Sequence, residues 1–460
     1  MDIPAKAEKI LNTLQSAGYE AYVVGGCVRD SLLNRTPGDW DITTSATPWQ
    51  VKALFRKTVD TGLKHGTVTV LDGGEQFEVT TYRVDGTYED GRHPSSVTFT
   101  GSLKEDLQRR DFTINAMAYN KKDGLVDIFG GVRDLDRRLI RAVGDPEKRF
   151  EEDALRMMRA VRFAAQLDYK IDEDTAAAIG KLAPNLQKVS SERIRAELEK
   201  LLVSDHPEKL RTAYETGLTR YFLPEFDVCM ATPQNNPHHC YSVGEHILHS
   251  VTAAAAGEKA AAKVLPAGVN VTAGWDGRQK RILRLTMLLH DIAKPACRQT
   301  DENGIDHFHG HVEQSALLAD TILRRLKYDN DTRRSVVQLI KYHDWRFDSD
   351  PKSVRRAAAV VTRELFPLLM EVKRADIEAQ SDYTREEKTA QLEGWIRVWN
   401  ESVRAGDCLT VKELKVTGED LIAAGVKPGR QIGKTLHLML EDVLETPSHN
   451  DRQYLLSRYT

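Results

Sequence analysis

The sequence predicts an α+β fold, with a small mixed sheet in the first third of the chain and helices from there to the end. Two observations support this prediction. Before residue 145, short runs of β-branched and aromatic residues lie between glycine-containing turns, which is typical of strands. After residue 145 such runs are absent, and apolar residues recur at three- and four-residue intervals, which is typical of amphipathic helices.

The composition indicates a globular protein of several domains without a strong charge bias. The chain has 460 residues, of which 41% are hydrophobic and 29% charged, and its formal net charge is -3. Any surface that binds nucleic acid must therefore be local, which favours a selective binder over a coating protein. The five cysteines form no Cys-x-x-Cys pair and are expected to be reduced thiols.

No targeting or membrane segment is predicted. Residues 1–18 have an amphipathic helical pattern with charges throughout, unlike a signal peptide. No apolar run approaches the roughly 18 residues that a membrane helix needs. We therefore expect a cytoplasmic protein with no membrane partner.

The first candidate site is a pair of carboxylates, Asp39 and Asp41, beside the β-prone run 42–44. Side chains alternate along a strand, so both are expected on one face, roughly 7 Å apart. Like charges at this spacing repel one another unless a cation lies between them, and a hard divalent ion prefers oxygen ligands. The pair predicts a metal site, although Asp-x-Asp is also common in solvated turns.

Two consecutive glycines lie shortly before this pair. Gly25 and Gly26 follow the apolar run 22–24, and Arg29 stands one helical turn later. A glycine backbone can approach a phosphate without a Cβ in the way, and a guanidinium can neutralise its charge. Together with the carboxylates, this segment predicts a nucleoside triphosphate held by a loop while metal ions activate a hydroxyl for in-line attack.

At these two motifs the chain resembles the bacterial class II tRNA nucleotidyltransferases and poly(A) polymerases, whose signature is G-G-x-V-R-D followed by D-x-D. The resemblance implies a nucleotidyltransferase head at 1–142, an all-helical neck at 143–205, a body at 206–380 and a tail at 381–460. It also implies that Asp39 and Asp41 hold two Mg²⁺ ions, while Gly26, Arg29 and Arg110 bind the triphosphate.

The rest of the head is predicted to complete the sheet. Residues 66–71 and 76–82 alternate around the turn 72–74 and indicate a β-hairpin, in which Glu78 could supply a third carboxylate. Residues 85–99 have the composition of a mobile surface loop. In the resembled family a loop at this place helps the enzyme to switch between nucleotides. Residues 125–131 are expected to close the sheet.

Residues 107–118 contain R-R-D-F-T-I-N-A, which matches a further signature of the family. Arg110 precedes an apolar segment that must be buried. It is therefore expected at the edge of the core, where it could reach a triphosphate with two hydrogen bonds. Asp111 is the alternative to Glu78 as a third carboxylate of the head.

Residues 150–165 are predicted to form one helix that carries Asp153 and Arg156 as neighbours. C and A each present an amino donor beside a ring-nitrogen acceptor, whereas U and G present a carbonyl beside an N–H. A fixed carboxylate next to a fixed guanidinium would therefore accept C and A and reject U and G. The plain alternative is an ordinary salt bridge, but E-D-x-x-R stands where the resembled family carries its nucleotide-selecting residues.

Two more arginines follow on this helix. Three residues fall about 60° short of a full turn of an ideal helix, so positions three apart drift around it by about 60° a step. Arg162 is therefore expected on the far flank from Asp153. There it touches phosphate or braces the helix, while the resemblance implies that Arg159 and Arg162 both lie in the nucleotide site. Residues 189–202 contain S-x-E-R-I-x-x-E-L, which also matches the family, and are expected to support the selecting helix.

A second set of metal-ligand residue types clusters between 238 and 376. An adjacent His-Asp on an apolar helix is costly to bury without a metal or a charge partner. The order H…HD…H…H…D resembles the HD phosphohydrolase superfamily. It implies another divalent metal bound by His246, His290, Asp291 and Asp376, with His311 and His343 nearby. The alternative is a helical domain that keeps the pattern without catalysis.

Two further stretches have weaker patterns. Residues 253–277 are rich in Ala and Gly and are expected to form a surface connection. Residues 425–434 form a glycine-containing basic loop before a helix. This loop is either a plain turn or, as in the tail of the resembled family, a support for an RNA backbone.

The resemblance implies template-independent addition of C, C and A to the 3′ end of tRNA from CTP and ATP. A poly(A) polymerase is a rival, but its G-R-R-F-type segment is missing at residues 61–66. Enzymes that add only CC or only A differ mainly in the loop 85–99, whose full length here favours both activities. A rival from another class is an HD metal phosphohydrolase whose head only docks RNA.

Overall fold

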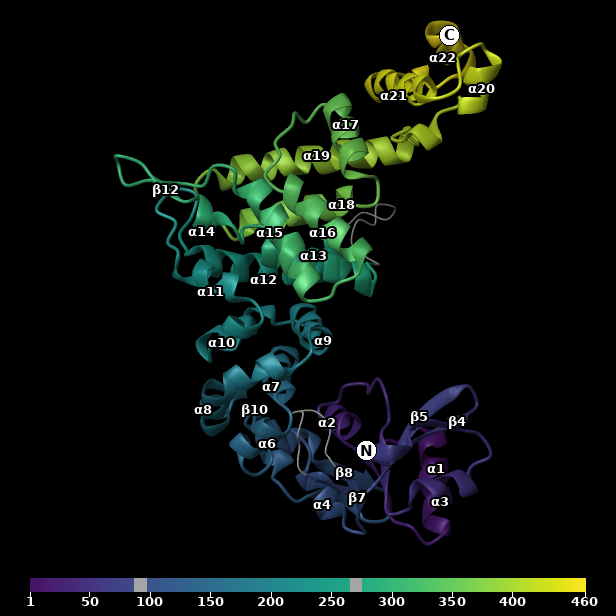
Figure 1. Ribbon diagram of the computed structural model, residues 1–460, viewed down its shortest axis with the longest axis vertical. Helices are drawn as coiled ribbons and strands as arrows, with labels where there is room; N and C mark the ends of the chain where they lie inside the picture. The colour runs from purple at the N-terminus through teal and green to yellow at the C-terminus, as the bar shows by residue number, and fades with distance from the viewer. Residues whose placement is uncertain (87–96, 265–274) are drawn as a thin grey trace. The chain divides into compact units, whose positions relative to one another are not determined.

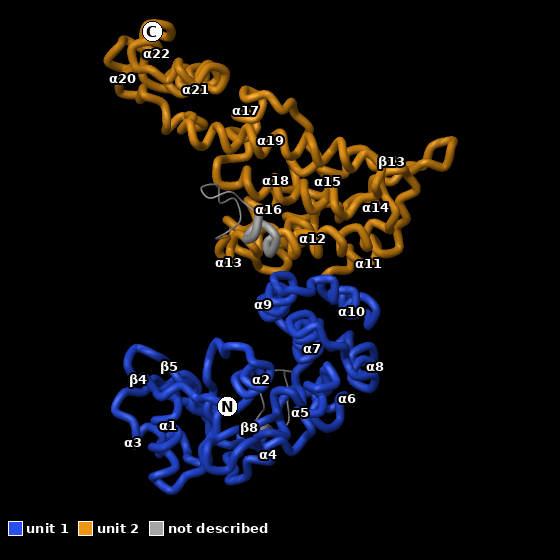
Figure 2. The backbone as a smooth tube through the Cα atoms, turned by 180° about the vertical axis from the view of Figure 1, so that it is seen from behind, with its two compact units in different colours: residues 1–222 blue, residues 223–460 orange. Residues whose placement is uncertain are grey.

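The computed structural model divides the chain into two compact units, residues 1–222 and residues 223–460 (Figure 2). It describes residues 1–86, 97–264 and 275–460. Figure 1 shows the sheet strands in the first unit, whereas the described part of the second unit is almost entirely helical. The predicted α+β class is confirmed.

Unit 1 begins with a seven-stranded mixed sheet in the order β3-β4-β5-β2-β1-β8-β9. β2 and β5 are parallel, and the other neighbours are antiparallel. The strands are β1 (Ala21–Val24), β2 (Ile42–Thr44), β3 (Thr58–Gly62), β4 (Thr67–Asp72), β5 (Glu75–Thr81), β8 (Met117–Asn120) and β9 (Gly124–Asp127). β9 lies at an edge, so the prediction that this segment closes the sheet is confirmed.

The predicted hairpin consists of β4 and β5. Its turn residues Gly73 and Gly74 both have positive φ, 59° and 84°, between the paired residues Asp72 and Glu75. Two positive φ angles give the turn a twist that matches antiparallel strands. β5 then pairs with β2, so Glu78 lies on the strand next to the one that Asp41 precedes.

The predicted loop 85–99 is partly strand. β6 (Arg83–Asp85) and β7 (Val97–Phe99) pair antiparallel outside the main sheet. Residues 97–99 are therefore not loop, because their backbone hydrogen bonds are made with β6. Residues 87–96 lie outside the described residues.

Helices in the head pack on the sheet. They are α1 (Ala5–Ser16), α2 (Gly26–Leu32), α3 (Pro48–Leu54), α4 (Leu103–Gln108) and α5 (Gly131–Asp136). Leu103 and Leu107 of α4 pack with Tyr22, Tyr82 and Ala118 of the sheet region in one buried cluster. Because α4 is fixed by this cluster, the residues that follow its end, 109–111, are held at the edge of the core.

The remainder of unit 1 is helical apart from a short parallel pair, β10 (Leu139–Ile140) with β11 (Lys170–Ile171). Its helices are α6 (Pro146–Glu152), α7 (Leu155–Leu167), α8 (Glu173–Leu182), α9 (Ser191–Leu202) and α10 (Leu210–Glu215). The prediction of one continuous helix over residues 150–165 is wrong, because the chain is extended at Asp153 between α6 and α7.

Unit 2 is built from helices. They are α11 (Pro224–Ala231), α12 (Val243–Val264), α13 (Gly277–Leu289), α14 (Lys294–Cys297), α15 (His311–Arg325), α16 (Asn330–Tyr342), α17 (Pro351–Val361), α18 (Phe366–Glu378), α19 (Arg385–Ala405), α20 (Gly418–Ala423), α21 (Arg430–Glu445) and α22 (Arg452–Tyr459). Within its described residues, the strands are the short antiparallel pair β12 (Gln299–Thr300) and β13 (Asp306–His307). None of the helices searched is both long and apolar enough to span a bilayer.

The prediction of a surface connection at residues 253–277 is wrong for its first half. Residues 253–264 continue α12, and Ala254 and Ala255 are buried. Alanine has the highest helix propensity, and its small side chain allows close packing of a neighbouring helix. Residues 265–274 lie outside the described residues.

Candidate functional site

The acid pair lies in the extended segment directly before β2. The backbone carbonyl of Asp41 accepts a hydrogen bond from Val24 N (3.0 Å), which ties this segment to the end of β1. Asp39 is exposed and Asp41 is half-buried. The two carboxylates therefore lie where the glycine turn after β1 begins.

The electrostatics around Asp41 favour a bound cation. Burial and the Asp39 carboxylate raise the pKa of Asp41 to about 6; Glu78 adds to the rise, and Arg110 opposes it. A carboxyl group held near neutrality by other carboxylates gains most when a positive ion shares the site. These oxygen donors fit a hard divalent ion.

Of the two candidates for a third carboxylate, Glu78 lies near the acid pair and Asp111 is committed elsewhere. Glu78 is exposed on β5 and contributes to the raised pKa of Asp41. Asp111 is buried and accepts hydrogen bonds from Arg159 Nε (2.8 Å) and Asn115 Nδ2 (3.2 Å). Burial acts to raise the pKa of Asp111, but Arg159 outweighs burial and holds that pKa well below its ordinary value.

The glycine turn lies against Arg110. Gly25 has a φ of +81° and immediately precedes α2, whose first residue is Gly26. A Cβ on Gly25 would lie only 3.0 Å from Arg110 Nη1, and Arg110 Nη2 lies 3.5 Å from Asp106 Oδ2. Arg110 thus lies beside the glycine turn, and Gly25 is the residue whose missing side chain makes room for the guanidinium. A Cβ on Gly26 would instead lie 3.8 Å from Arg29 Nη2.

Arg29 is already engaged by protein groups. Its side chain donates to both carboxylate oxygens of Asp30 (2.8 and 3.0 Å) and to Asn115 Oδ1 (2.7 Å). The residue is buried, and its guanidinium lies 5.1 Å from the centre of the Phe163 ring. Arg29 therefore links α2 to the R-R-D-F-T-I-N-A segment and to α7.

Asp153 has a different environment from the predicted one. Its backbone is extended (φ -143°, ψ 103°), Oδ1 accepts from Leu155 N (3.0 Å), and Oδ2 accepts from Arg193 Nη2 of α9 (2.7 Å). A carboxylate that accepts from the first amides of a helix favours a chain break at that point. This capping explains why residues 150–165 form two helices.

Arg156 has partners of its own. Nη1 donates to Glu152 Oε2 (2.6 Å) and to the Arg149 carbonyl (3.1 Å), and Nη2 donates to the Arg109 carbonyl (3.0 Å). Among the described residues, no side-chain bond joins Asp153 to Arg156. The alternative of an ordinary salt bridge between them is therefore wrong.

The other two arginines of α7 are held by buried acids. Arg159 pairs with Asp111, whereas Arg162 pairs with Glu197 of α9 and donates to Gln166 Oε1 (2.8 Å). Arg162 and Glu197 are both buried. Of the two roles left open for Arg162, bracing the helix is the one these contacts show.

Three residues of this site were missed by the sequence interpretation: Asp106, Asn115 and Arg193. Asp106 is fully buried and accepts from Arg109 Nε (2.9 Å) and Thr43 Oγ1 (3.0 Å). Asp106 stands among charged and polar residues and carried no signal in the sequence. A polar residue inside an apolar segment must have a partner, so Asn115, in the apolar run 112–118, did carry one. Arg193 carried none beyond its family motif, because its partner lies 40 positions away.

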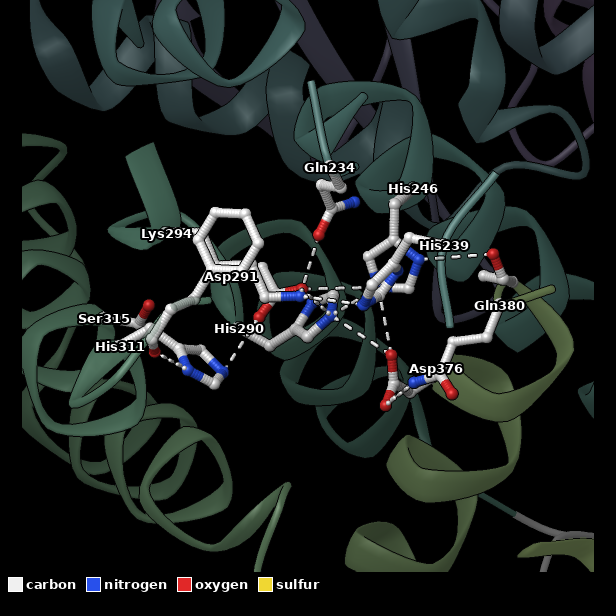
Figure 3. Close-up of polar contacts among 12 residues, drawn as sticks. Gln234, His239, His246, His290, Asp291, Lys294, His311, Ser315, Asp376 and Gln380 are labelled. Atoms are coloured by element: carbon white, nitrogen blue, oxygen red, sulfur yellow. Dashed lines mark hydrogen bonds and ion pairs between the residues drawn. The ribbon is translucent and has the colours of Figure 1, made fainter. Parts of the chain in front are cut away.

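In unit 2, the predicted ligands converge (Figure 3). His246 Nε2 lies 3.2 Å from His290 Nε2, 3.3 Å from Asp291 Oδ2 and 3.0 Å from Asp376 Oδ1. On the other side of Asp291, Oδ1 lies 3.4 Å from His311 Nε2 and 3.7 Å from His343 Nε2. Two groups of ligand atoms therefore share Asp291, one of them with His246 and His290 and the other with His311 and His343.

The second nitrogen of each of these histidines faces a backbone carbonyl. The Nδ1-to-oxygen distances are 3.2 Å for His246 to Ala379, 2.8 Å for His290 to Met287, 2.8 Å for His311 to Phe308, and 2.7 Å for His343 to Ile340. A carbonyl only accepts, so Nδ1 carries the proton and Nε2 offers a lone pair. Such lone pairs and carboxylates are stable together only around positive charge.

The charges in the cluster also indicate that a positive charge is needed among these ligands. Burial acts to lower the pKa of His290, but Asp291 and Asp376 outweigh burial and raise that pKa to about 10, so this imidazole favours a positive charge at Nε2, either a proton or, in its place, a metal ion. Asp291 Oδ1 is buried without a hydrogen-bond partner among the described residues. An unpartnered buried carboxylate oxygen is costly unless a cation binds it. Imidazole and carboxylate donors together fit a transition metal better than magnesium.

The cluster borders a cavity of about 510 Å³ that lies within unit 2. Basic side chains line it, among them Lys294, Arg346 and Lys388. Lys294 Nζ lies 2.7 Å from Asp291 Oδ2, and Lys388 Nζ donates to Gln380 (2.6 Å), which donates to Asp376 (2.9 Å). The lining also includes Asp306 and Asp344, so the walls carry both signs of charge. Basic side chains next to a metal-ligand cluster suit a phosphate ester.

Three family profiles match the chain in order. The poly A polymerase head domain matches residues 21–141, and the probable RNA and SrmB-binding site of polymerase A matches residues 168–230. The putative domain 2 of tRNA nucleotidyltransferase matches residues 298–458. The first match contains the acid pair, the glycine turn and Arg110.

Two curated relatives and one solved structure are similar to the chain. The CCA-adding enzyme of Limosilactobacillus reuteri is 54% identical over 216 residues, 47% of this chain and 54% of the relative. That of Lactobacillus helveticus is 57% identical over 205 residues, 45% of this chain and 51% of the relative. The match thus spans about half the length of these relatives. The crystal structure of the Bacillus stearothermophilus CCA-adding enzyme is 30% identical, with a TM-score of 0.69, and covers 100% of this chain and 98% of its own.

The mixed-sheet head with its acid pair and glycine turn defines a nucleotidyltransferase of the poly A polymerase type, a class that depends on metal ions. Within this class the similarity to the Bacillus stearothermophilus protein extends over the whole chain. The chain belongs to the family of CCA-adding enzymes.

Proposed function

We propose that this protein adds C, C and A to the 3′ end of tRNA, from CTP and ATP and without a nucleic-acid template. The observation that carries the proposal is that one compact unit holds the acid pair, the glycine turn with Arg110, and the fixed groups Asp153 and Arg156. Arg156 is tied to the neighbour of Arg110, because it donates to the Arg109 carbonyl (3.0 Å). The similar Bacillus stearothermophilus enzyme is described in complex with CTP, which supports CTP as a substrate here.

In this proposal Asp39 and Asp41 hold two Mg²⁺ ions, which supply charge stabilisation for the attacking 3′-hydroxyl and the departing pyrophosphate. Gly26, Arg29 and Arg110 bind the triphosphate. Gly25 keeps a backbone without a side chain beside the Arg110 guanidinium, so this cation can lie close to a phosphate. The nucleotide is positioned by the protein before the hydroxyl attacks.

Asp153 and Arg156 read the base. A carboxylate has about four acceptor positions and a guanidinium five N–H donors. Asp153 uses two acceptor positions within the protein, and Arg156 makes three hydrogen bonds. The remaining capacity can accept from the amino group and donate to the ring nitrogen of C or A. Arg159 and Arg162 belong to the same nucleotide site and hold α7 in place there.

We assign catalysis to residues 1–142, nucleotide selection to 143–205, the HD-type metal site to 206–380 and tRNA binding to 381–460. The glycine-containing loop before α21 (Gly425 φ +96°, Gly429 φ +119°) is the element of the tail that we propose supports an RNA backbone. The five cysteines are free, as expected in the reducing cytoplasm, where we place the protein.

The test is incorporation of labelled CTP and ATP into tRNA that lacks its 3′ end, in Mg²⁺ buffer. The wild-type protein should add C, C and A and should leave UTP and GTP unused. Asp39→Ala should abolish addition, whereas Asp60→Ala, which removes an exposed carboxylate of the same head, should not. A chain of A residues would favour a poly(A) polymerase, and CC or A alone would favour a partial enzyme. No addition at all would contradict the proposal.

We propose a second activity for unit 2, hydrolysis of a phosphate ester. The observation that favours it is the set of histidine nitrogens around Asp291 at a cavity whose lining includes Lys294, Arg346 and Lys388. His246, His290, Asp291 and Asp376 would hold a divalent transition metal, which supplies a metal-activated water as nucleophile. The test is hydrolysis of a chromogenic phosphate monoester and of a cyclic phosphodiester, with Asp291→Asn as the inactive variant. A metal-loaded protein that hydrolyses neither would contradict this activity.

A further inference from the structure

In unit 1, Asp153 and Arg156, the two residues proposed to read the base, both form ion pairs with residues that do not read it. The acceptor Asp153 is bound by Arg193, and the donor Arg156 is bound by Glu152. Arg193 approaches from α9, whereas Glu152 is the last residue of α6. Asp153 and Arg156 are therefore each paired with a different residue of opposite charge, and not with each other.

Without these partners, Asp153 and Arg156 have a competing arrangement available. They lie three positions apart, and Arg156 N donates to the Asp153 carbonyl (3.0 Å), so the backbone forms one turn between them. Asp153 is itself extended, but a hydrogen-bonded turn brings its first and fourth residues within about 7 Å at Cα, within reach of these two long side chains. A released Asp153 carboxylate would therefore bind the Arg156 guanidinium and use up the acceptor and the donor that the base needs.

The part of α9 that carries Arg193 is held firmly against α7. Glu197, one turn further along the helix, is buried and paired with the buried Arg162 of α7. The Arg193 and Asp153 side chains are 23% and 17% exposed, so their ion pair is partly shielded from solvent. A charged hydrogen bond in such a place is stronger and less screened than an exposed one.

We propose that Arg193 is a specificity-determining positioning residue: it keeps the Asp153 carboxylate away from Arg156 and oriented to accept from a base. Arg193 itself touches no nucleotide in this account. Its effect passes through Asp153, which Leu155 N fixes at the second oxygen. This inference rests on the proposed function, because it concerns the choice among the four nucleotides.

The experiment compares kcat/KM for CTP, ATP, UTP and GTP on tRNA lacking its 3′ end, for the wild-type protein and Arg193→Ala. We expect the preference for CTP over UTP, and for ATP over GTP, to fall by about tenfold to a hundredfold, the effect of losing one charged hydrogen bond. Arg193→Lys keeps the charge and one donor but not the planar fork, so its preference should lie between the two.

A matched control lies on the same helix. Arg195 pairs with Glu199 at 3.8 Å, and Arg195→Ala removes the same side chain two positions away. Its nucleotide preference should equal that of the wild type. Thermal unfolding of all variants shows whether α9 is intact. If Arg193→Ala does not fold, Arg193→Lys decides, since it retains a cation in the half-buried position.

The outcomes separate the inference from the function on which it rests. If the wild-type protein does not extend the truncated tRNA, both the proposed function and the inference are wrong. The inference alone is wrong if the wild-type protein adds C and A but the four kcat/KM values of Arg193→Ala fall by one common factor. It is also wrong if these values do not fall at all. That result would reduce Arg193 to a structural support of α7.

Discussion

The two metal-ligand clusters of this chain differ in donors, burial and the way in which they are held. In unit 1, Asp39 is exposed and Asp41 half-buried, and both offer only oxygen. In unit 2, His246, His290 and Asp291 are buried, and nitrogen donors predominate. The first arrangement suits ions that arrive and leave with a triphosphate, whereas the second suits an ion that stays bound.

The two clusters also differ in the contacts that hold their ligand side chains in place. Each unit 2 histidine is fixed by a carbonyl acceptor at Nδ1, so its Nε2 lone pair already points into the cluster. The acid pair of unit 1 is fixed through its backbone and is completed by Arg110 at a glycine turn. In the proposed assignment of the two sites, one chain separates a resident metal from ions delivered with a substrate by the choice and burial of donors.

The largest expected effect breaks the unit 1 site. Asp41→Asn removes a charged oxygen ligand, and nucleotide addition should fall by about a thousandfold or more, since metal stabilisation of a phosphoryl transition state is worth several kcal/mol. The same variant should retain the metal content of unit 2. Elemental analysis together with labelled CTP incorporation checks both. Addition that survives within tenfold would show that Asp41 holds no metal ion needed for the reaction.

The reciprocal substitution breaks the unit 2 site. Asp291→Asn removes the carboxylate that both ligand groups share, so the protein should lose most of its bound transition metal, about a hundredfold or more in affinity. Nucleotide addition should stay within about twofold. Asp382→Asn, which changes an exposed carboxylate of the same unit, is the control and should keep the metal. Equal metal content in Asp291→Asn and the wild type would contradict the assignment.

Chelation sharpens the comparison without a mutation. A nitrogen chelator selective for transition metals should strip unit 2 and abolish phosphate-ester hydrolysis, while nucleotide addition in excess Mg²⁺ should change by less than about twofold. EDTA, which binds magnesium as well, should stop both reactions, and added Mg²⁺ should restore nucleotide addition alone. If the nitrogen chelator stopped nucleotide addition, the two sites would share a metal requirement and the contrast would be wrong.

The features that the sequence could predict are those determined locally. The hairpin of β4 and β5 depends on an alternating pattern and on Gly73 and Gly74, all within a few positions. The ligand types Asp39, Asp41, His290 and Asp291 stand out because buried or clustered charges need a cation. The mixed sheet and the helical remainder followed from the periodicity of apolar residues.

The features that could not be predicted depend on distant partners. The helix break at Asp153 is stabilised in part by Arg193, and nothing near Asp153 announces that contact. The helix through residues 253–264 was misjudged because this Ala- and Gly-rich stretch has little apolar pattern. A Cβ on Gly257 would clash with Arg374 and Glu371, so glycine is needed there for packing and not for a turn.

The smallest expected effect concerns Gly25 and separates crowding from backbone strain. Gly25 and Gly18 have similar positive φ angles, 81° and 89°, but a Cβ on Gly25 meets Arg110 at 3.0 Å whereas one on Gly18 meets nothing within 4 Å. Alanine at Gly18 should cost about 1–2 kcal/mol of unfolding free energy, since it must adopt a positive φ. Alanine at Gly25 should cost more, since its ψ of -127° lies far from the left-handed helical region that other residues can adopt. Thermal or urea unfolding measures both costs.

The two variants should differ in catalysis. Gly25→Ala pushes the Arg110 guanidinium away from the turn, so the KM for CTP and ATP should rise by about tenfold, the loss of roughly one charged contact to phosphate. Gly18→Ala should leave both KM values unchanged although it too places an alanine at a positive φ. If the two variants have the same KM values, Arg110 does not bind the triphosphate from its place beside Gly25, and the unit 1 site holds its substrate without that cation.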